Sequence, residues 1–120
     1  MESEGFEYFT KKDFWYVLAE SWELGPDQVL SRKIMGEWLA VFRDTEGRAT
    51  ALQDRCLHRS AQLSRGTVSK GRLSCPYHGW QYDAKGRVVA VPSQGPTAQT
   101  QNKCAKIYAV KECDDFIYVT

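Results

Sequence analysis

The chain has 120 residues, a length that fits one domain with its own core but leaves no room for a separate catalytic lobe. The 16 Lys and Arg residues against 15 Asp and Glu residues give a net charge of +1, so no global field favours nucleic acid or an anionic membrane surface. No stretch is apolar enough to span a bilayer, and the acidic residues 1–5 are unlike a secretory signal or a transit peptide. We therefore expect a cytoplasmic protein whose partners include neither nucleic acid nor a membrane.

Short runs of β-branched, aromatic and aliphatic residues alternate with turn signals along the chain. The predicted strands are residues 15–19, 29–34, 38–43, 49–54, 79–82, 88–91, 106–111 and 116–119. Segments 44–47 and 83–86 carry Asp and Gly where tight hairpins need them, so neighbouring strands should pair antiparallel. A turn at 11–15 is the only helical expectation, and the polar residues 93–102 are expected to form a surface loop. The sequence thus predicts an all-β fold, an antiparallel barrel or sandwich.

Two short boxes contain half of the cysteines and both histidines of the chain: Cys56-Leu57-His58 and Cys75-Pro76-Tyr77-His78. The order C-x-H then C-x-x-H fits a Rieske [2Fe–2S] cluster, in which two cysteines hold one iron and two histidines hold the other. It also fits a tetrahedral zinc ion. Zinc fingers usually place two cysteines together and then two histidines, whereas each box here mixes one of each, which favours the cluster. A zinc-stabilised structural or binding module without redox activity remains the alternative.

The residues around the boxes carry a more specific signal. Cys56-Leu57-His58-Arg59 followed by Cys75-Pro76-Tyr77-His78-Gly79-Trp80-Gln81-Tyr82 resembles the Rieske domain of ring-hydroxylating and related oxygenases. The likeness also includes segments 14–17 and 63–66, Gly86 and Pro92. It implies a Rieske-type antiparallel β-barrel over residues 1–120, and we expect a smaller cluster-binding subdomain at roughly 54–92.

The resemblance also assigns the ligands of one [2Fe–2S] cluster per chain. Cys56 and Cys75 would hold a buried inner iron. His58 and His78 would hold the outer iron through Nδ1 and leave their Nε2 edges near the surface, where an electron can pass to a partner.

Respiratory Rieske proteins, by the same resemblance, link the two boxes with a disulfide and offer a serine hydroxyl to the cluster. The disulfide positions are Ala61 and Tyr77 in this chain, and Trp80 stands at the serine position. Both departures predict a midpoint in the lower part of the Rieske range of about −150 to +300 mV.

The histidine count limits what the chain does alone. An oxygenase of this family also needs a mononuclear iron held by two histidines and a carboxylate. The chain has 2 histidines, and both are predicted cluster ligands, so no mononuclear-iron site fits within it. The sequence therefore predicts one-electron transfer, either as a stand-alone Rieske-type ferredoxin or as the N-terminal domain through which electrons enter a ring-hydroxylating dioxygenase. The residues in and around the boxes favour the second possibility, an oxygenase domain. The implied partners are a reductase, an oxygenase catalytic domain, or both.

Three residues in or close to the boxes are candidates for tuning the cluster or docking a partner: Arg59, Tyr77 and Trp80. For Trp80 and the neighbouring Tyr82, packing in a strand is the more usual role of an alternating aromatic.

Positive charge and two further cysteines lie outside the boxes. Arg65, Lys70 and Arg72 suggest a modest positive rim suited to an acidic redox partner. Cys104 and Cys113 are expected to be buried or semi-exposed thiols with a small apolar role, not additional ligands or a disulfide.

Overall fold

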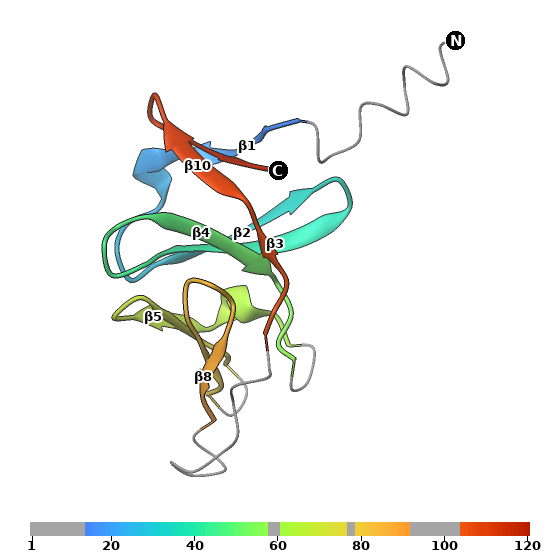
Figure 1. The fold of residues 1–120 in the computed structure, drawn as a ribbon, viewed down its shortest axis with the longest axis vertical. Coiled ribbons are helices and arrows are strands. Elements are labelled where there is room, and N and C mark those ends of the chain that lie inside the picture. Colours follow the sequence, from blue (N-terminus) through green and yellow to red (C-terminus); the bar gives the residue numbers. More distant parts are fainter. Residues whose placement is uncertain (1–13, 58–60, 77–78, 92–103) are drawn as a thin grey trace.

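The computed structural model describes residues 14–57, 61–76, 79–91 and 104–120, whose strands form three antiparallel sheets stacked as tiers (Figure 1). The upper sheet has the order β1 (Tyr16–Glu20), β11 (Phe116–Val119), β10 (Val110–Cys113). The central sheet has the order β2 (Val29–Ile34), β3 (Glu37–Arg43), β4 (Ala49–Gln53), β9 (Ile107–Tyr108). The lower sheet has the order β5 (Thr67–Ser69), β6 (Arg72–Ser74), β7 (Gln81–Tyr82), β8 (Val88–Ala90). The all-β antiparallel prediction is confirmed.

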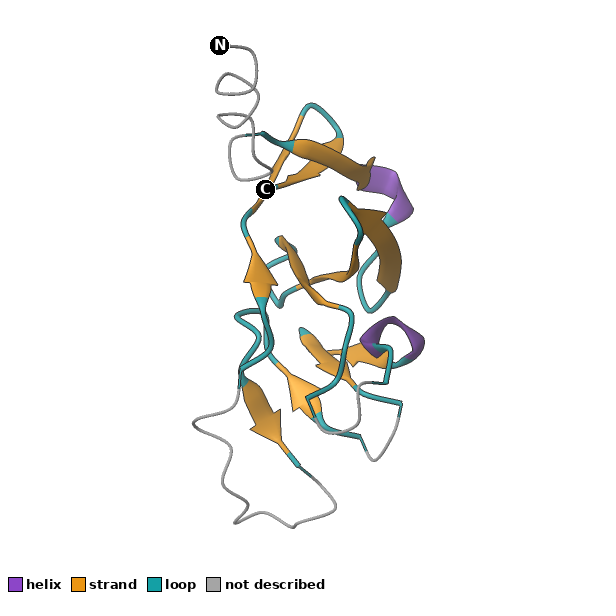
Figure 2. Cartoon of the chain, turned by 90° about the vertical axis from the view of Figure 1, so that its right-hand side faces the viewer, coloured by secondary structure: helices purple, strands orange, loops and turns teal. Residues whose placement is uncertain are grey.

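Helical structure in the described residues is limited to two 3-10 turns. Turn η2 (Ser21–Glu23) follows β1, and turn η3 (Leu63–Arg65) precedes β5. Figure 2 shows η3 where the central and lower tiers meet. No helix in the described part of the chain is long and apolar enough to cross a membrane.

Strand β3 of the central sheet is buried on both faces over residues 39–42, because successive side chains of a strand point to opposite sides. In β3, Leu39 and Val41 join an upper core, while Ala40 and Phe42 join a lower core. None of these four is more than 1% exposed. The upper core comprises Leu18, Ala19, Leu24, Leu39, Val41, Ala51, Ile117 and Val119. The lower core comprises Ala40, Phe42, Leu52, Cys56, Leu63, Val68, Leu73, Cys75, Trp80, Tyr82, Val88, Val91 and Ala105.

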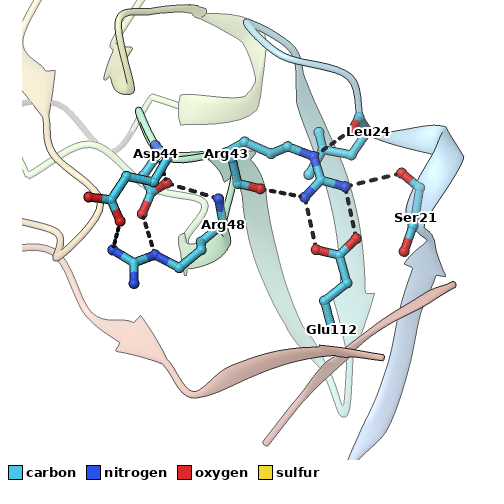
Figure 3. A network of polar contacts seen from close by, with 8 residues as sticks. Ser21, Leu24, Arg43, Asp44, Arg48 and Glu112 are labelled. Carbon is cyan, nitrogen blue, oxygen red and sulfur yellow. Dashed lines mark hydrogen bonds and ion pairs between the residues drawn. The ribbon is translucent and has the colours of Figure 1, made fainter. Parts of the chain in front are cut away.

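Arg43 at the end of β3 clamps the central sheet to the upper sheet (Figure 3). Its guanidinium forms a two-point ion pair with Glu112 of β10, at 2.9 and 3.0 Å. It also donates to the backbone carbonyls of Leu24, Ser21 and Gly47, at 2.8, 3.2 and 2.8 Å. The hydrogen bond from Arg43 lowers the pKa of Glu112. The clamp therefore keeps both charges at neutral pH and ties three segments to one side chain.

Two hairpins are built alike, as the Asp and Gly residues predicted. In segments 44–48 and 83–87 the aspartate Oδ1 accepts the backbone N–H groups two and four residues later, all at 2.8 or 2.9 Å. Gly47 and Gly86 have φ of 84° and 80°, a region that glycine enters without strain. The tight hairpin prediction is confirmed at both places.

Several strand bounds differ from the prediction. β2 and β11 have the predicted bounds, β1 is shifted by one residue, and β3, β4, β7 and β8 differ at one end by one or two residues. Strands β5 and β6 and both 3-10 turns were not predicted. The single strand predicted at 106–111 is divided at Ala109, because β9 pairs with β4 and β10 pairs with β11. The turn at 11–15 falls largely, and the loop at 93–102 entirely, outside the described residues.

Candidate metal centre

Cys56 and Cys75 both belong to the lower core, although they come from different parts of the chain. Cys56 follows β4, and Cys75 follows β6. Their exposed fractions are 1% and 3%, and both belong to one cluster of buried side chains. The structure thus brings together the two predicted thiolate ligands inside the protein.

Each cysteine also closes a tight loop in the same way. The Cys56 N–H donates to the carbonyl of Ala61 at 2.7 Å, and the Cys75 N–H donates to the carbonyl of Trp80 at 2.7 Å. In both boxes the bond reaches the residue five positions later. The predicted histidine ligands fall inside these two loops by sequence. The same backbone hydrogen bond therefore closes both loops, and a buried cysteine lies where each loop begins.

The residue after each cysteine is exposed, so the boxes run from the core to the surface. Leu57 is 47% exposed, and Pro76 is also exposed. Gly79 has φ of 71°, the positive value that the sequence suggested for a glycine at this loop. Buried sulfurs with surface residues next to them suit an iron held by cysteines inside and a second iron held by histidines outside.

Four of the predicted site residues are not described. His58, Arg59, Tyr77 and His78 lie outside the described ranges, so their predicted roles remain predictions. Within the described ranges no group of three metal-ligating side chains gathers.

Tyr82 makes a contact with a predicted ligand that the sequence did not reveal. Its side chain is fully buried, and its hydroxyl donates to Cys56 Sγ at 3.3 Å while accepting the Leu57 N–H at 2.9 Å. Burial, followed by the bond to Cys56, raises the pKa of Tyr82 above the usual phenol value. The hydroxyl therefore keeps its proton and remains a donor to sulfur. The strand pattern located this aromatic residue, but not the direction of its hydroxyl.

Trp80, a candidate for docking or tuning, lies in the lower core with an exposed fraction of 5%. It belongs to the same buried cluster as the two cysteines, which accords with the packing role considered for it. The indole is not available at the surface for a partner.

The predicted positive rim is divided between two places. Lys70 and Arg72 line a cleft of about 320 Å³ between three hairpin turns, together with Lys85 and Arg87. Arg65 is not among the cleft residues, and its Nε donates to Gln62 Oε1 at 2.8 Å.

Cys104 and Cys113 are exposed and neither forms a disulfide, so the expectation that these thiols are buried or semi-exposed is wrong.

The Rieske [2Fe–2S] domain model matches residues 14–109. The chain belongs to this family. The predicted resemblance is thus confirmed, and membership implies a [2Fe–2S] cluster as the cofactor of this domain. The buried thiolate pair fits that group, because Cys56 and Cys75 supply the sulfur ligands of one iron.

Among curated relatives, this Rieske domain is 40% identical over 109 residues to the vanillate O-demethylase oxygenase subunit of Pseudomonas sp. (strain HR199 / DSM 7063), covering 90% of this chain and 29% of the relative. It is 34% identical over 106 residues to protein TIC 55, chloroplastic, of Arabidopsis thaliana, covering 88% of this chain and 20% of the relative. The chain therefore spans less than a third of the length of either relative.

Solved structures agree with the sequence relatives. Apo dicamba monooxygenase matches with a TM-score of 0.80 and 38% identity, over 88% of this chain and 32% of that chain. NdmA of Pseudomonas putida CBB5 matches with a TM-score of 0.81 and 38% identity, over 88% of this chain and 33% of that chain. This Rieske domain thus shares its fold with about one third of each of these two chains.

Proposed function

We propose that this Rieske domain transfers single electrons within an oxygenase system, through a [2Fe–2S] cluster held by Cys56, His58, Cys75 and His78. The observation that carries the proposal is the pair of matched loops. Each has a buried cysteine at its base, closed by the same N–H to carbonyl bond of 2.7 Å, and the family motif assigns one histidine to each loop.

The bound cluster supplies the chemistry, by taking up and releasing one electron. The residues of the chain set how easily that happens. Two neutral imidazoles in place of two thiolates remove negative charge, which favours an added electron. The Tyr82 hydroxyl donates to Cys56 Sγ, and a hydrogen bond to sulfur stabilises negative charge there. The buried side chains of the lower core keep water from the sulfurs, while His58 and His78 form the electron port.

The partners we propose are a reductase as donor and an oxygenase catalytic domain as acceptor. The support comes from the relatives, whose names include an oxygenase subunit and a monooxygenase. The chain has 2 histidines, both used by the proposed cluster, so the mononuclear iron of such a system belongs elsewhere. We place the domain in the cytoplasm, since thiolate ligands favour a reducing compartment. No observation favours the zinc-stabilised alternative.

Replacing His78 with Cys tests the ligand assignment. The added thiolate brings negative charge to the outer iron, so the midpoint in protein-film voltammetry should fall relative to wild type. Cys113→Ser serves as the control, because this exposed cysteine lies outside both boxes, and its midpoint should match wild type. An unchanged midpoint in a cluster-containing His78→Cys protein would contradict the assignment.

A further inference from the structure

Asp54 is the one buried charged side chain in the part of the chain that the structure describes, with an exposed fraction of 6%. It stands between the end of β4 and the first box. Its Oδ1 accepts the Ser64 N–H at 2.7 Å, and its Oδ2 accepts the Ser64 hydroxyl at 2.6 Å and the Ser31 hydroxyl at 3.3 Å. Its own N–H donates to the Trp38 carbonyl at 2.9 Å. A buried carboxylate is thus fixed by three side-chain contacts and one backbone bond.

The Asp54 to Ser64 bonds close a ring around the first box. Cys56 lies two residues after Asp54, and Ser64 belongs to η3, which follows the box. The Cys56 N–H to Ala61 carbonyl bond closes a smaller ring inside this one. The first cysteine loop is therefore anchored at both of its ends to the same carboxylate.

The same 3-10 turn also touches the strand that leads to the second box. Gly66 follows η3, and a Cβ added to it would lie 1.8 Å from the Ser74 carbonyl oxygen. Such an approach is open to glycine alone, because real Cβ atoms do not come so near to a backbone oxygen. Ser74 is the residue before Cys75. Contacts through Asp54, Ser64, Gly66 and Ser74, which we call the brace, thus connect the start of one box to the start of the other.

We propose that Asp54 is a positioning residue that acts through this brace to set the separation of Cys56 and Cys75 for the cluster. The proposal rests on the proposed function, since it assumes that both cysteines bind one cluster. A rigid separation matters because a cluster of fixed size tolerates little error in the positions of its ligands, and the groups that orient ligands strongly affect metal retention. A neutral apolar residue at position 54 would leave the Ser64 N–H buried without its acceptor.

The Asp54→Asn variant distinguishes position from charge at this site. Its side-chain carbonyl accepts the Ser64 N–H, and its amide group donates to the two serine hydroxyls, so the brace persists without the negative charge. Asp54→Ala removes both. Asp44→Ala is the matched control, because Asp44 also accepts two backbone N–H groups, at 2.8 and 2.9 Å, but lies in the hairpin between β3 and β4.

The experiment measures the rate of cluster loss to an iron chelator, with the EPR line shape of the reduced protein and the melting temperature on the same samples. We expect Asp54→Ala to lose its cluster about 10-fold or more faster than wild type, with broadened EPR lines. Contacts behind the metal ligands are typically worth about 10–100-fold in metal affinity, so Ser64→Ala, which removes one of them, should also lose its cluster faster than wild type, but less so than Asp54→Ala. Asp54→Asn keeps the contacts, and its loss rate should therefore stay within about 3-fold of wild type. Asp44→Ala should lower the melting temperature without changing the loss rate or the line shape.

Equal rates of cluster loss for Asp54→Ala and Asp44→Ala would overturn the proposed role of Asp54. A rate for Asp54→Asn as high as that for Asp54→Ala would overturn it too. If Asp54→Ala does not fold, Ser64→Ala decides the matter, because it removes one hydroxyl and leaves the Ser64 N–H bond in place. A wild-type protein without iron and sulfide refutes the proposed function instead, so the two failures are distinguishable.

Discussion

The upper and lower halves of the domain are stabilised in different ways. Around the upper core, β2 and β3 pair over six residues, and the two-point ion pair of Arg43 with Glu112 ties the sheets together. In the lower sheet, the strands have two or three residues each, and side chains such as Asp54 and Tyr82 connect neighbouring segments by bonding to loops. Strands of this length contribute few ladder bonds.

This contrast indicates that the two halves of the domain have different roles. We expect the upper half to be ordered by its own strands and ion pairs. The lower half contains the two buried cysteines, and we expect the proposed cluster to stabilise it, because a metal group that binds the folded state adds its binding energy to folding.

Removal of the cluster should produce the largest difference between the two halves. In protein freed of iron and sulfide, we expect the amides of β5 to β8 to lose their native chemical shifts, because these short strands lose the group that joins the loops they carry. Amides of β2, β3 and β11 should keep theirs. A ¹⁵N–¹H correlation spectrum of the two forms checks this. Uniform loss across all three sheets would show that the halves do not differ in this way.

Arg43→Met should weaken the upper half alone. The ion pair is partly shielded, with side chains 15% and 29% exposed, so its loss should lower the free energy of unfolding by about 2 kcal/mol. Arg48→Met is the matched control, because the Arg48 side chain is 74% exposed and its pairs should contribute less than about 0.5 kcal/mol. Urea denaturation followed by circular dichroism measures both. Similar losses for the two variants would refute the special role of the clamp.

Tyr82→Phe should affect the lower half and its proposed cluster site. The variant loses the hydroxyl that bonds to Cys56 and Leu57, which should cost about 1 kcal/mol of stability and lower the midpoint, because sulfur loses a hydrogen-bond donor. Tyr108→Phe is the control, since its hydroxyl bonds to Glu37 and not to a cysteine. Protein-film voltammetry should show an unchanged midpoint for Tyr108→Phe. A midpoint that is equal in the two variants would remove Tyr82 from the electron-transfer site.

The elements that the sequence predicted well are those whose signal is local. β11 is a run of β-branched and aromatic residues, β2 begins and ends with a β-branched residue, and both lie between turns; their predicted bounds are confirmed. β5 and β6 were missed because each has a single apolar residue, Val68 or Leu73, which makes no recognisable run. Segment 106–111 is divided because β9 pairs with the central sheet and β10 with the upper sheet. No residue in the segment indicates this division.

The site shows the same limit. Motif spacing identified Cys56 and Cys75, and the structure places both in one buried cluster. The part played by Asp54 depends on Ser31 and Ser64, which are 23 and 10 residues away from it and meet it only in the folded chain. Long-range contacts of this kind leave no periodic signal in a sequence, so they became visible only with the fold.

The most direct test of the central claim is the EPR spectrum of the dithionite-reduced protein, recorded with iron, zinc and acid-labile sulfide analysis on the same sample. We predict a rhombic signal of low average g, with about two irons and two sulfides per chain, as expected for a [2Fe–2S] centre with two histidine ligands. A silent sample with about one zinc per chain and no sulfide would contradict the account, because it would make this domain a structural metal module without electron transfer.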